Sequence, residues 1–332
     1  MEPQIGFCTT PDGARIAYTT LGHGSALVIP PSYFIVLNAY KSVPEVRHYL
    51  NRLALYHTVV IYDQRGAGLS DRNRAVFTLE SELADLETVI NHLKLDKVIL
   101  SAASQAGPIA IAYAAKYPER VTHLVLYGTY ANYGKFLSEE IKTSLISLIR
   151  QPHNWVGTRT VASIMTPQIN INELELFVNL QRESVTPEVN ARLIEMQFEL
   201  DVTNLCSSVK TPTLVMHRKG DKFILFKAGL ELASLIPNAR FVPLEGNEHY
   251  SFLGDVETGL RNTFQFLGDP VPDKSADNAG KTESLSNPPE PKTEQKKGNW
   301  LRMSNPLVKI LITILASVIA GVILLLIKSL FP

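Results

Sequence analysis

Short apolar runs rich in β-branched residues recur along the first 268 positions of this sequence, separated by polar turns or amphipathic stretches. Such runs predict strands, and eight of them occur, at residues 5–8, 15–20, 26–29, 58–62, 97–100, 123–127, 213–217 and 240–244. Between several runs the apolar residues step by three or four positions, which predicts helices, as at Leu79, Leu83, Leu86, Ile90 and Leu93. Strands that alternate with helices favour an α/β fold with a mostly parallel eight-stranded sheet and helices on both faces.

Residues 131–209 interrupt this alternation. Their apolar positions have helical spacing, as at Leu137, Ile141, Leu145 and Ile149. We therefore expect a helical cap at 131–209, inserted into a core made of residues 1–130 and 210–268. The cap contains Trp155, Phe177 and Phe198, which would suit a pocket for a small, apolar acyl substrate, although ordinary packing explains these residues equally well.

The composition changes after residue 268. The next thirty or so positions are dominated by Asp, Pro, Ser, Asn, Glu and Lys, and no aromatic residue occurs until Trp300. Such a segment buries too little apolar surface to offset its conformational entropy. Residues 269–305 are therefore expected to form a disordered linker.

A long apolar segment follows the linker. Ile310 to Ile327 is a run of 18 uncharged residues bracketed by Lys309 and Lys328. About twenty helical residues span the hydrocarbon core of a bilayer. Residues 306–329 are therefore expected to form one transmembrane helix in contact with the lipid bilayer.

The flanks of this segment predict its orientation. Lysines and arginines are more numerous before the helix than after it, which predicts a single-pass C-terminal anchor with the catalytic domain on the cytoplasmic side. Ser317 and Gly321 are four positions apart and would allow a homodimer through the membrane helix.

The overall charge narrows the range of partners. The sequence has 32 Lys and Arg against 32 Asp and Glu, so there is no electrostatic basis for binding a nucleic acid. Its cysteines and histidines lack the spacing of metal ligands, and no metal or cofactor is expected.

The stretch from Lys97 to Pro108 carries the clearest chemical signal. A buried strand runs directly into small residues around Ser104, and a helical pattern follows at once. This layout is typical of a nucleophile elbow, where a serine occupies a strained turn between a strand and a helix. The backbone N–H of Gln105 would then face a developing oxyanion at the helix N-terminus. Alanines stand where the pattern G-x-S-x-G has glycines, and taken alone an ordinary N-cap serine looks similar.

Further motifs give the sequence a resemblance to the α/β-hydrolase family over nearly all of residues 5–268. Residues 62–72 (YDQRGAGLSDR) resemble the loop after the family's fourth strand. Residues 104–108 (SQAGP) and 117–121 (YPERV) resemble its nucleophile elbow and the helix behind it. The resemblance is to the subgroup whose third-strand loop carries Pro-Pro in place of His-Gly.

The resemblance also implies where the other catalytic residues lie. Asp221 is the only carboxylate in the turn after the strand at 213–217, and His249 follows the last strand by five residues. The implied triad has Ser104 as nucleophile, His249 as general base and acid, and Asp221 to orient and stabilise the imidazole. The second oxyanion donor would be the N–H of Tyr33 or Ser32, because the preceding prolines have none. We prefer Tyr33.

These observations predict a membrane-anchored serine hydrolase that cleaves a carboxylic ester or a related acyl bond through an acyl-enzyme. Two other functions stay open: a catalytically silent ligand sensor with the same fold, and cofactor-free peroxidase-like or C–C bond hydrolysis with the same triad. Asp63, Arg65 and Ser70 are interpreted as residues that hold their own loop together, and His217 as a structural histidine.

Overall fold

The computed structural model describes residues 4–32, 36–151 and 155–271. Its centre is one eight-stranded sheet with the order β1-β2-β4-β3-β5-β6-β7-β8. The strands are β1 (Gly6–Thr9), β2 (Arg15–Leu21), β3 (Ser25–Ile29), β4 (His57–Tyr62), β5 (Val98–Ala103), β6 (Val121–Tyr127), β7 (Thr213–Arg218) and β8 (Arg240–Leu244). Strand β2 pairs antiparallel with both β1 and β4, and the other pairs are parallel. The predicted mostly parallel, eight-stranded sheet is confirmed.

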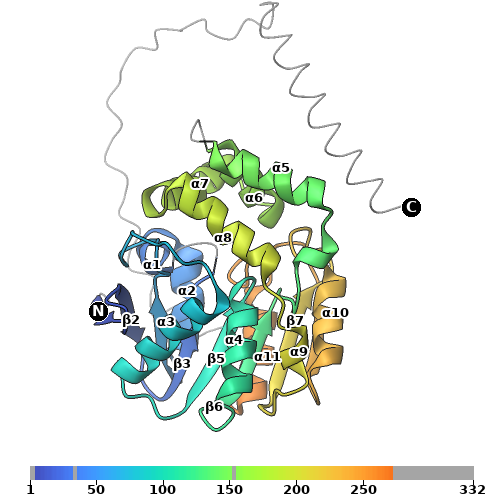
Figure 1. Ribbon diagram of the computed structural model, residues 1–332. Helices are drawn as coiled ribbons and strands as arrows, with labels where there is room; N and C mark the ends of the chain where they lie inside the picture. The colour runs from blue at the N-terminus through green and yellow to red at the C-terminus, as the bar shows by residue number, and fades with distance from the viewer. Residues whose placement is uncertain (1–3, 33–35, 152–154, 272–332) are drawn as a thin grey trace, which may run out of the picture. The chain divides into compact units, whose positions relative to one another are not determined.

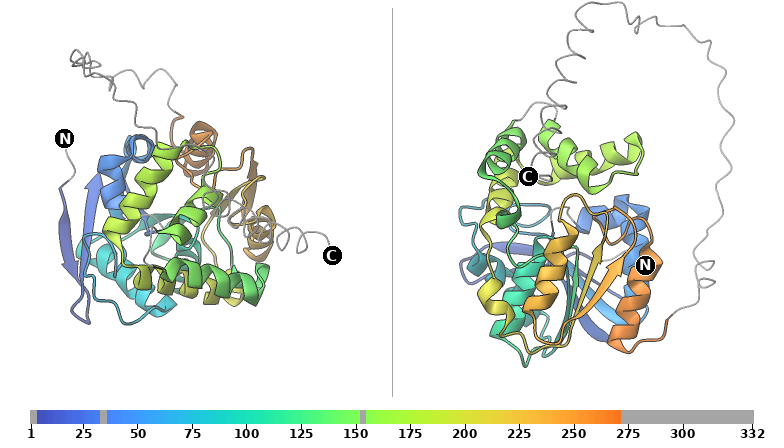
Figure 2. Two further views of the ribbon diagram at one scale, coloured as in Figure 1. Left: turned by 90° about the horizontal axis from the view of Figure 1, so that it is seen from above. Right: turned by 90° about the vertical axis from the view of Figure 1, so that its right-hand side faces the viewer.

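Helices cover both faces of the sheet (Figures 1 and 2). One face carries α1 (Val36–Ser42), α2 (Pro44–Leu53) and α11 (Val256–Leu267), and the other carries α3 (Leu79–His92), α4 (Ala106–Lys116) and α10 (Phe226–Leu235). Successive residues of a strand face opposite sides of the sheet. In β3, Leu27 packs with the first group of helices and Val28 with the second. A strand buried on both faces is therefore apolar at nearly every position, which is the pattern that predicted it.

The cap lies above the sheet (Figure 1). Its described residues form four α-helices. These are α5 (Glu139–Arg150), α6 (Val156–Met165), α7 (Ile171–Ser184) and α8 (Pro187–Glu199), with a short 3₁₀ turn at Gly134–Phe136 before them. Asn170 begins α7 with a capping box, its side chain accepting from the N–H groups of Asn172 and Glu173. A bridge between Asn132 and Asp201 joins the two connections to the core.

The cap helices span a narrower range, from Glu139 to Glu199, than the predicted cap at residues 131–209. Helix α9 (Thr203–Cys206) follows the cap helices, but Cys206 packs in the core with residues of α4 and β5. The start of the predicted linker also differs. Asp269 still belongs to the core, because its carboxylate lies 2.8 Å from His57 Nε2 and its N–H donates to Phe264 O.

Within the described ranges, no helix combines the length and the apolar character needed to cross a membrane. The predicted transmembrane helix at 306–329 and nearly all of the predicted linker lie outside these ranges.

Candidate active site

Ser104 occupies a sharp turn between β5 and α4. Its φ angle is +54°, in the left-handed region that side-chain-bearing residues seldom adopt. Several hydrogen bonds stabilise this backbone. The N–H of Ser104 donates to Tyr127 O at 3.2 Å, and the Ser104 carbonyl accepts from Thr129 Oγ1 at 2.5 Å and from Gly107 N at 3.1 Å. Strain held in place by such bonds is typical of a functional turn.

The close contact behind this turn requires a glycine at position 107. A Cβ added to Gly107 would lie 1.9 Å from Thr129 Oγ1, far inside van der Waals contact. Helix α4 can therefore approach the end of β6 only because residue 107 has no side chain. Ala102 and Ala106, which stand at the glycine positions of the motif, are both fully packed in the core.

Asp221 and His249 form a buried pair at the carboxyl ends of the last strands. His249 Nδ1 lies 2.7 Å from Asp221 Oδ2, and both residues are under 5% exposed. The other carboxylate oxygen accepts from the N–H groups of Phe223 at 2.9 Å and Ile224 at 3.1 Å. These bonds fix the carboxylate at the start of the loop after β7, so that one oxygen faces the imidazole.

The surroundings of Asp221 keep it ionised. Burial by itself would raise the pKa of this carboxyl, but the electrostatic attraction and hydrogen bond of His249, together with the nearby His217, outweigh burial and hold the pKa well below its usual range. His217 lies 3.6 Å from Asp221 Oδ2, while its Nε2 lies 2.8 Å from the carbonyl of Ile224. This contact within the Asp221 turn agrees with a structural role for His217.

Gly128 provides the surface on which the imidazole packs. Its φ is +52°, and a Cβ there would lie 3.4 Å from His249 Cε1 and 3.6 Å from Asp221 Oδ2. The T-shaped contact with the Phe223 ring, 5.1 Å between centroids, supports the imidazole as well.

Arg218 holds the loop that carries His249. This arginine ends β7 and is 2% exposed. Its Nη1 donates to the carbonyls of Glu248 at 3.1 Å and Tyr250 at 3.4 Å, and its Nη2 donates to the carbonyls of Leu253 and Asp255. One guanidinium thus spans four backbone acceptors between residues 248 and 255.

The cap also contacts this loop. The N–H of His249 donates to Met165 O at the end of α6 at 2.8 Å, and Gln168 N donates to the Glu248 carboxylate at 3.2 Å. The position of the imidazole therefore depends on the cap as well as on the core.

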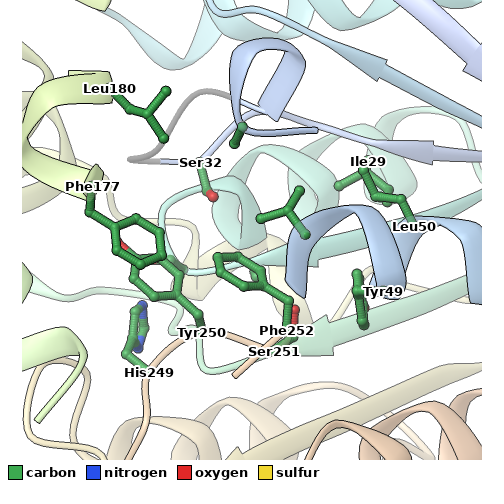
Figure 3. Close-up of a pocket in the computed structure, with 14 residues that line it drawn as sticks. Ile29, Ser32, Tyr49, Leu50, Phe177, Leu180, His249, Tyr250, Ser251 and Phe252 are labelled. Atoms are coloured by element: carbon green, nitrogen blue, oxygen red, sulfur yellow. The ribbon is translucent and has the colours of Figure 1, made fainter. Parts of the chain in front are cut away.

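Ser104 and His249 line one pocket, shown in Figure 3. The buried Ser104 hydroxyl has no hydrogen-bond partner among the described residues, so the structure does not join it to His249 as closely as it joins His249 to Asp221. Rotation about the Cα–Cβ bond of Ser104 moves the hydroxyl between staggered positions, and hydrogen bonds between a nucleophile and its base are often long without substrate.

The two predicted oxyanion donors differ in what the structure describes. Gln105 is the N-cap of α4, where the first backbone N–H groups have no acceptor within the helix. Its position beside Ser104 is the one that the elbow requires. Tyr33 lies outside the described residues.

Aromatic and aliphatic side chains form most of the pocket wall. The rings of Phe177, Tyr250 and Phe252 stack, with centroids 4.9–6.4 Å apart (Figure 3). The remaining lining residues, besides Ser104 and His249, are Ile29, Ser32, Ala39, Val46, Tyr49, Leu50, Ala103, Leu180 and Ser251. Of the three cap aromatics named from the sequence, only Phe177 is among these. Phe198 instead packs on Tyr133, and Trp155 packs in a separate apolar cluster.

The residues of α2 in this wall are absent from the sequence predictions. Val46 and Leu50 are four positions apart, and Leu53 follows three positions later, so a short helical period was present. Lys41, Ser42 and Pro44 interrupt the apolar pattern just before it.

Contacts in the loop after β4 agree with its structural interpretation. The carboxylate of Asp63 accepts from Leu69 N at 2.8 Å and from Leu37 N at 3.4 Å, and Ser70 Oγ donates to the Asp63 carbonyl at 2.7 Å. Arg65 forms ion pairs with Asp85 and Asp12. Burial raises the pKa of Asp63 to about 6 despite the two N–H donors.

Comparison with known proteins identifies the family. Residues 42–256 match the family model described as the alpha/beta hydrolase fold. The chain belongs to this family, and it is an enzyme of the α/β-hydrolase class.

Individual relatives show a range of activities. The chain is 24% identical over 267 residues to a putative non-heme haloperoxidase of Mycobacterium phage D29, covering 74% of this chain and 88% of the relative. It is 26% identical over 200 residues to a 2-hydroxy-6-oxo-2,4-heptadienoate hydrolase of Pseudomonas putida, covering 57% and 71%. Among solved structures, an esterase from Exiguobacterium antarcticum matches with a TM-score of 0.70, at 21% identity over 79% of this chain and 99% of the esterase.

Proposed function

We propose that this enzyme is a serine hydrolase that cleaves carboxylic esters or related acyl bonds through Ser104, His249 and Asp221. The observation that carries the proposal is the 2.7 Å contact between His249 and Asp221, which faces a pocket that also holds a serine at φ +54°. A neutral serine hydroxyl is a weak nucleophile, and an imidazole oriented by a carboxylate is the group that activates it.

In the proposed reaction His249 carries each proton in turn. Because His249 Nδ1 donates to Asp221, its Nε2 keeps the lone pair that accepts the Ser104 proton. Ser104 Oγ then attacks the substrate carbonyl, and the negative oxygen is stabilised by the N–H of Gln105 at the start of α4. Protonated His249 donates its proton to the leaving alcohol. Water, deprotonated by the same imidazole, then hydrolyses the acyl-enzyme.

The pocket favours uncharged acyl groups. None of its described lining residues is Lys, Arg, Asp or Glu. A free carboxylate on the substrate would lose its hydration there without gaining a cationic partner. The heptadienoate in the name of the Pseudomonas putida relative carries such a carboxylate, so the lining favours neutral esters over this compound.

A serine-directed fluorophosphonate probe tests the assignment of the nucleophile. We expect the wild-type protein to be labelled and Ser104→Ala to be unlabelled. Ser163→Ala, which removes an exposed serine hydroxyl of the cap, serves as the matched control and should be labelled like the wild type. Correctly folded wild-type protein that resists the probe would contradict the proposal and favour a ligand sensor. A series of p-nitrophenyl esters of increasing acyl length then measures the preferred substrate size.

The proposal includes the membrane anchor at residues 306–329. Its support is the sequence alone, the 18 uncharged residues from Ile310 to Ile327 and the excess of basic residues before them. We expect the full chain to stay in the membrane pellet after alkaline carbonate extraction, and a variant with Ile314→Arg and Ile319→Arg to be released. Release of the wild-type chain would contradict the anchor and leave the hydrolase assignment intact. Protease accessibility from the cytoplasmic side tests the predicted orientation.

A further inference from the structure

Besides Ser32 and the Tyr250 phenol, which contacts Met165 Sδ, polar side chains occur at two separate places in the largely apolar pocket. Ser104 and His249 lie at the reacting end. Tyr49 and Ser251 form the second group, and Figure 3 shows them near each other on the opposite side of the cavity from His249. The proposed acyl-transfer reaction uses only the first group, so the second needs its own explanation.

The second group includes a third hydroxyl. The phenol of Tyr49, from α2, lies near the side-chain hydroxyls of Ser251, in the loop that carries His249, and Ser101, in β5, close enough for both to lower its pKa. Burial raises the pKa of the Tyr49 phenol, although both serine contacts oppose this, so the phenol keeps its proton at neutral pH. We call Tyr49, Ser101 and Ser251 the hydroxyl cluster.

The hydroxyl cluster has hydrogen-bonding capacity to spare. Each of its hydroxyls has one proton and can accept two bonds. Hydrogen bonds to or from the Tyr49 phenol would use at most two of the three protons. Within the described part of the chain, neither serine side chain has a further partner. Since buried polar groups are normally paired, a donor left over at the wall of a cavity is suited to a polar atom of a bound molecule.

The strand sets the distance between the two polar groups. Ser101 and Ala103 point to the same face of β5, and Ala103 lines the pocket directly before Ser104. Two residues of a strand span roughly 6.5 Å. With C–C bonds of about 1.5 Å, an acyl chain bound at Ser104 reaches the hydroxyl cluster with its fourth or fifth atom.

We propose that the hydroxyl cluster is a subsite for a neutral oxygen atom in the acyl group of the substrate. The substrates are then esters whose acyl chain carries an ether, hydroxyl or keto oxygen about four or five positions along, counted from the scissile carbonyl carbon. This inference rests on the proposed hydrolase function, because it concerns the acyl side of the same pocket. Because none of the described lining residues is Lys, Arg, Asp or Glu, the pocket favours a neutral oxygen over a carboxylate.

An oxygen scan tests the subsite. The substrates are p-nitrophenyl hexanoate and its three ether isosteres, the propoxyacetate, 3-ethoxypropanoate and 4-methoxybutanoate esters. Each kcat/KM is divided by the rate of hydroxide-catalysed hydrolysis, which removes differences in intrinsic reactivity. One hydrogen bond contributes about 0.5–1.5 kcal/mol, so we expect the 3-ethoxypropanoate or 4-methoxybutanoate ester to exceed hexanoate by about two- to tenfold.

Two variants connect this preference to the cluster. Tyr49→Phe and Ser251→Ala should each remove the preference for the ether ester. In both variants the kcat/KM for hexanoate should equal or exceed the kcat/KM for the ether ester. Tyr40→Phe is the matched control, because it deletes a phenol that bonds to Asn51 and does not line the pocket, and it should keep the preference. If Tyr49→Phe does not fold, Ser251→Ala alone tests whether the hydroxyl cluster causes the preference.

The outcomes separate the subsite from the hydrolase assignment. Turnover of all four esters without an oxygen preference, or with a preference that both variants retain, would overturn the subsite and leave the hydrolase function standing. If no ester is hydrolysed, the hydrolase function fails. Calorimetric titration of Ser104→Ala with the four corresponding methyl esters then tests the subsite by itself, and equal affinities would refute it.

Discussion

Arg218 is predicted to stabilise the active site by tying the histidine loop to the end of β7. Its guanidinium donates to four backbone carbonyls and has 2% exposure. Gly254 makes room for it, because a Cβ there would lie 3.1 Å from Nη1. In Arg218→Met the side chain remains long and apolar, but all four hydrogen bonds are lost.

The bond lengths set the expected magnitude. The bond to Glu248 is 3.1 Å long and the bond to Leu253 is closer, whereas those to Tyr250 and Asp255 are 3.4 Å long and therefore weak. Hydrogen bonds from a charged donor contribute about 1.5–3 kcal/mol each, so losing the two closer ones lowers the free energy of unfolding by about 3–6 kcal/mol. For a domain of this size, a loss of about 4 kcal/mol lowers Tm by roughly 8–16 °C.

Thermal unfolding and the rate of fluorophosphonate labelling are the two assays. Because the loop carries His249, we expect Arg218→Met to be labelled more slowly even at temperatures where it is fully folded. Arg218→Lys keeps the charge but not the planar guanidinium, so its stability and labelling rate should lie between those of the wild type and Arg218→Met. Lys219→Met removes the adjacent cation, whose partner Glu245 is on the surface, and should change stability by less than about 1 kcal/mol. An Arg218→Met protein within about 1 kcal/mol of the wild type and labelled at the wild-type rate would refute the reasoning.

Three other predictions follow from the site and its support. In Asp221→Asn the oxygen that accepts from Phe223 and Ile224 can be kept, so the amide NH₂ faces His249 Nδ1 and favours the tautomer with a proton on Nε2. Ester hydrolysis should then fall by about 10⁴-fold in kcat with near-native circular dichroism, and a loss below tenfold would contradict the role of Asp221. Gly107→Ala forces a methyl group against Thr129 and should destabilise the protein by about 1–3 kcal/mol in urea unfolding, whereas Gly259→Ala, where nothing lies within 4 Å, should not destabilise it. Asp63, with a pKa of about 6 in the folded protein, still holds its proton between about pH 4 and pH 6 while the unfolded chain has lost it, so its contribution to stability falls as pH rises through this window. Across this window the Asp63 carboxyl changes the free energy of unfolding by about 3 kcal/mol, which corresponds to two pKa units. Asp63→Asn should remove this change, and equal pH profiles of unfolding for the variant and the wild type would refute the prediction.

The strands could be predicted from the sequence to within three residues at either end, because the central ones are apolar on two faces and all are short runs bounded by polar residues. Helices α1 and α2 could not, since they are short and Pro44 separates them. Their course depends on packing against the sheet at Leu27 and Val59, contacts that local patterns do not contain.

The candidate site divides in a similar way. Ser104 could be identified because its turn needs a strand, small residues and a helix in immediate succession, all of which are local. The pairing of Asp221 with His249 brings together positions 28 apart in sequence, and only the resemblance to a family predicted it. Arg218 and the hydroxyl cluster gave no signal at all, because neither an arginine that binds carbonyls nor hydroxyls gathered from separate elements follow a periodic spacing.

The bridge between Asn132 and Asp201 means that the chain leaves the core and returns to it at neighbouring points. A segment attached in this way can be exchanged for another, or replaced by a short turn, without altering the order of the strands. Because Phe177 and Leu180 belong to that segment while Tyr49 and Ser101 do not, such grafts would change one half of the pocket and keep the other. They would also break the contact from Met165 to His249, so a transplanted segment must supply a carbonyl at that point if the base is to keep its place.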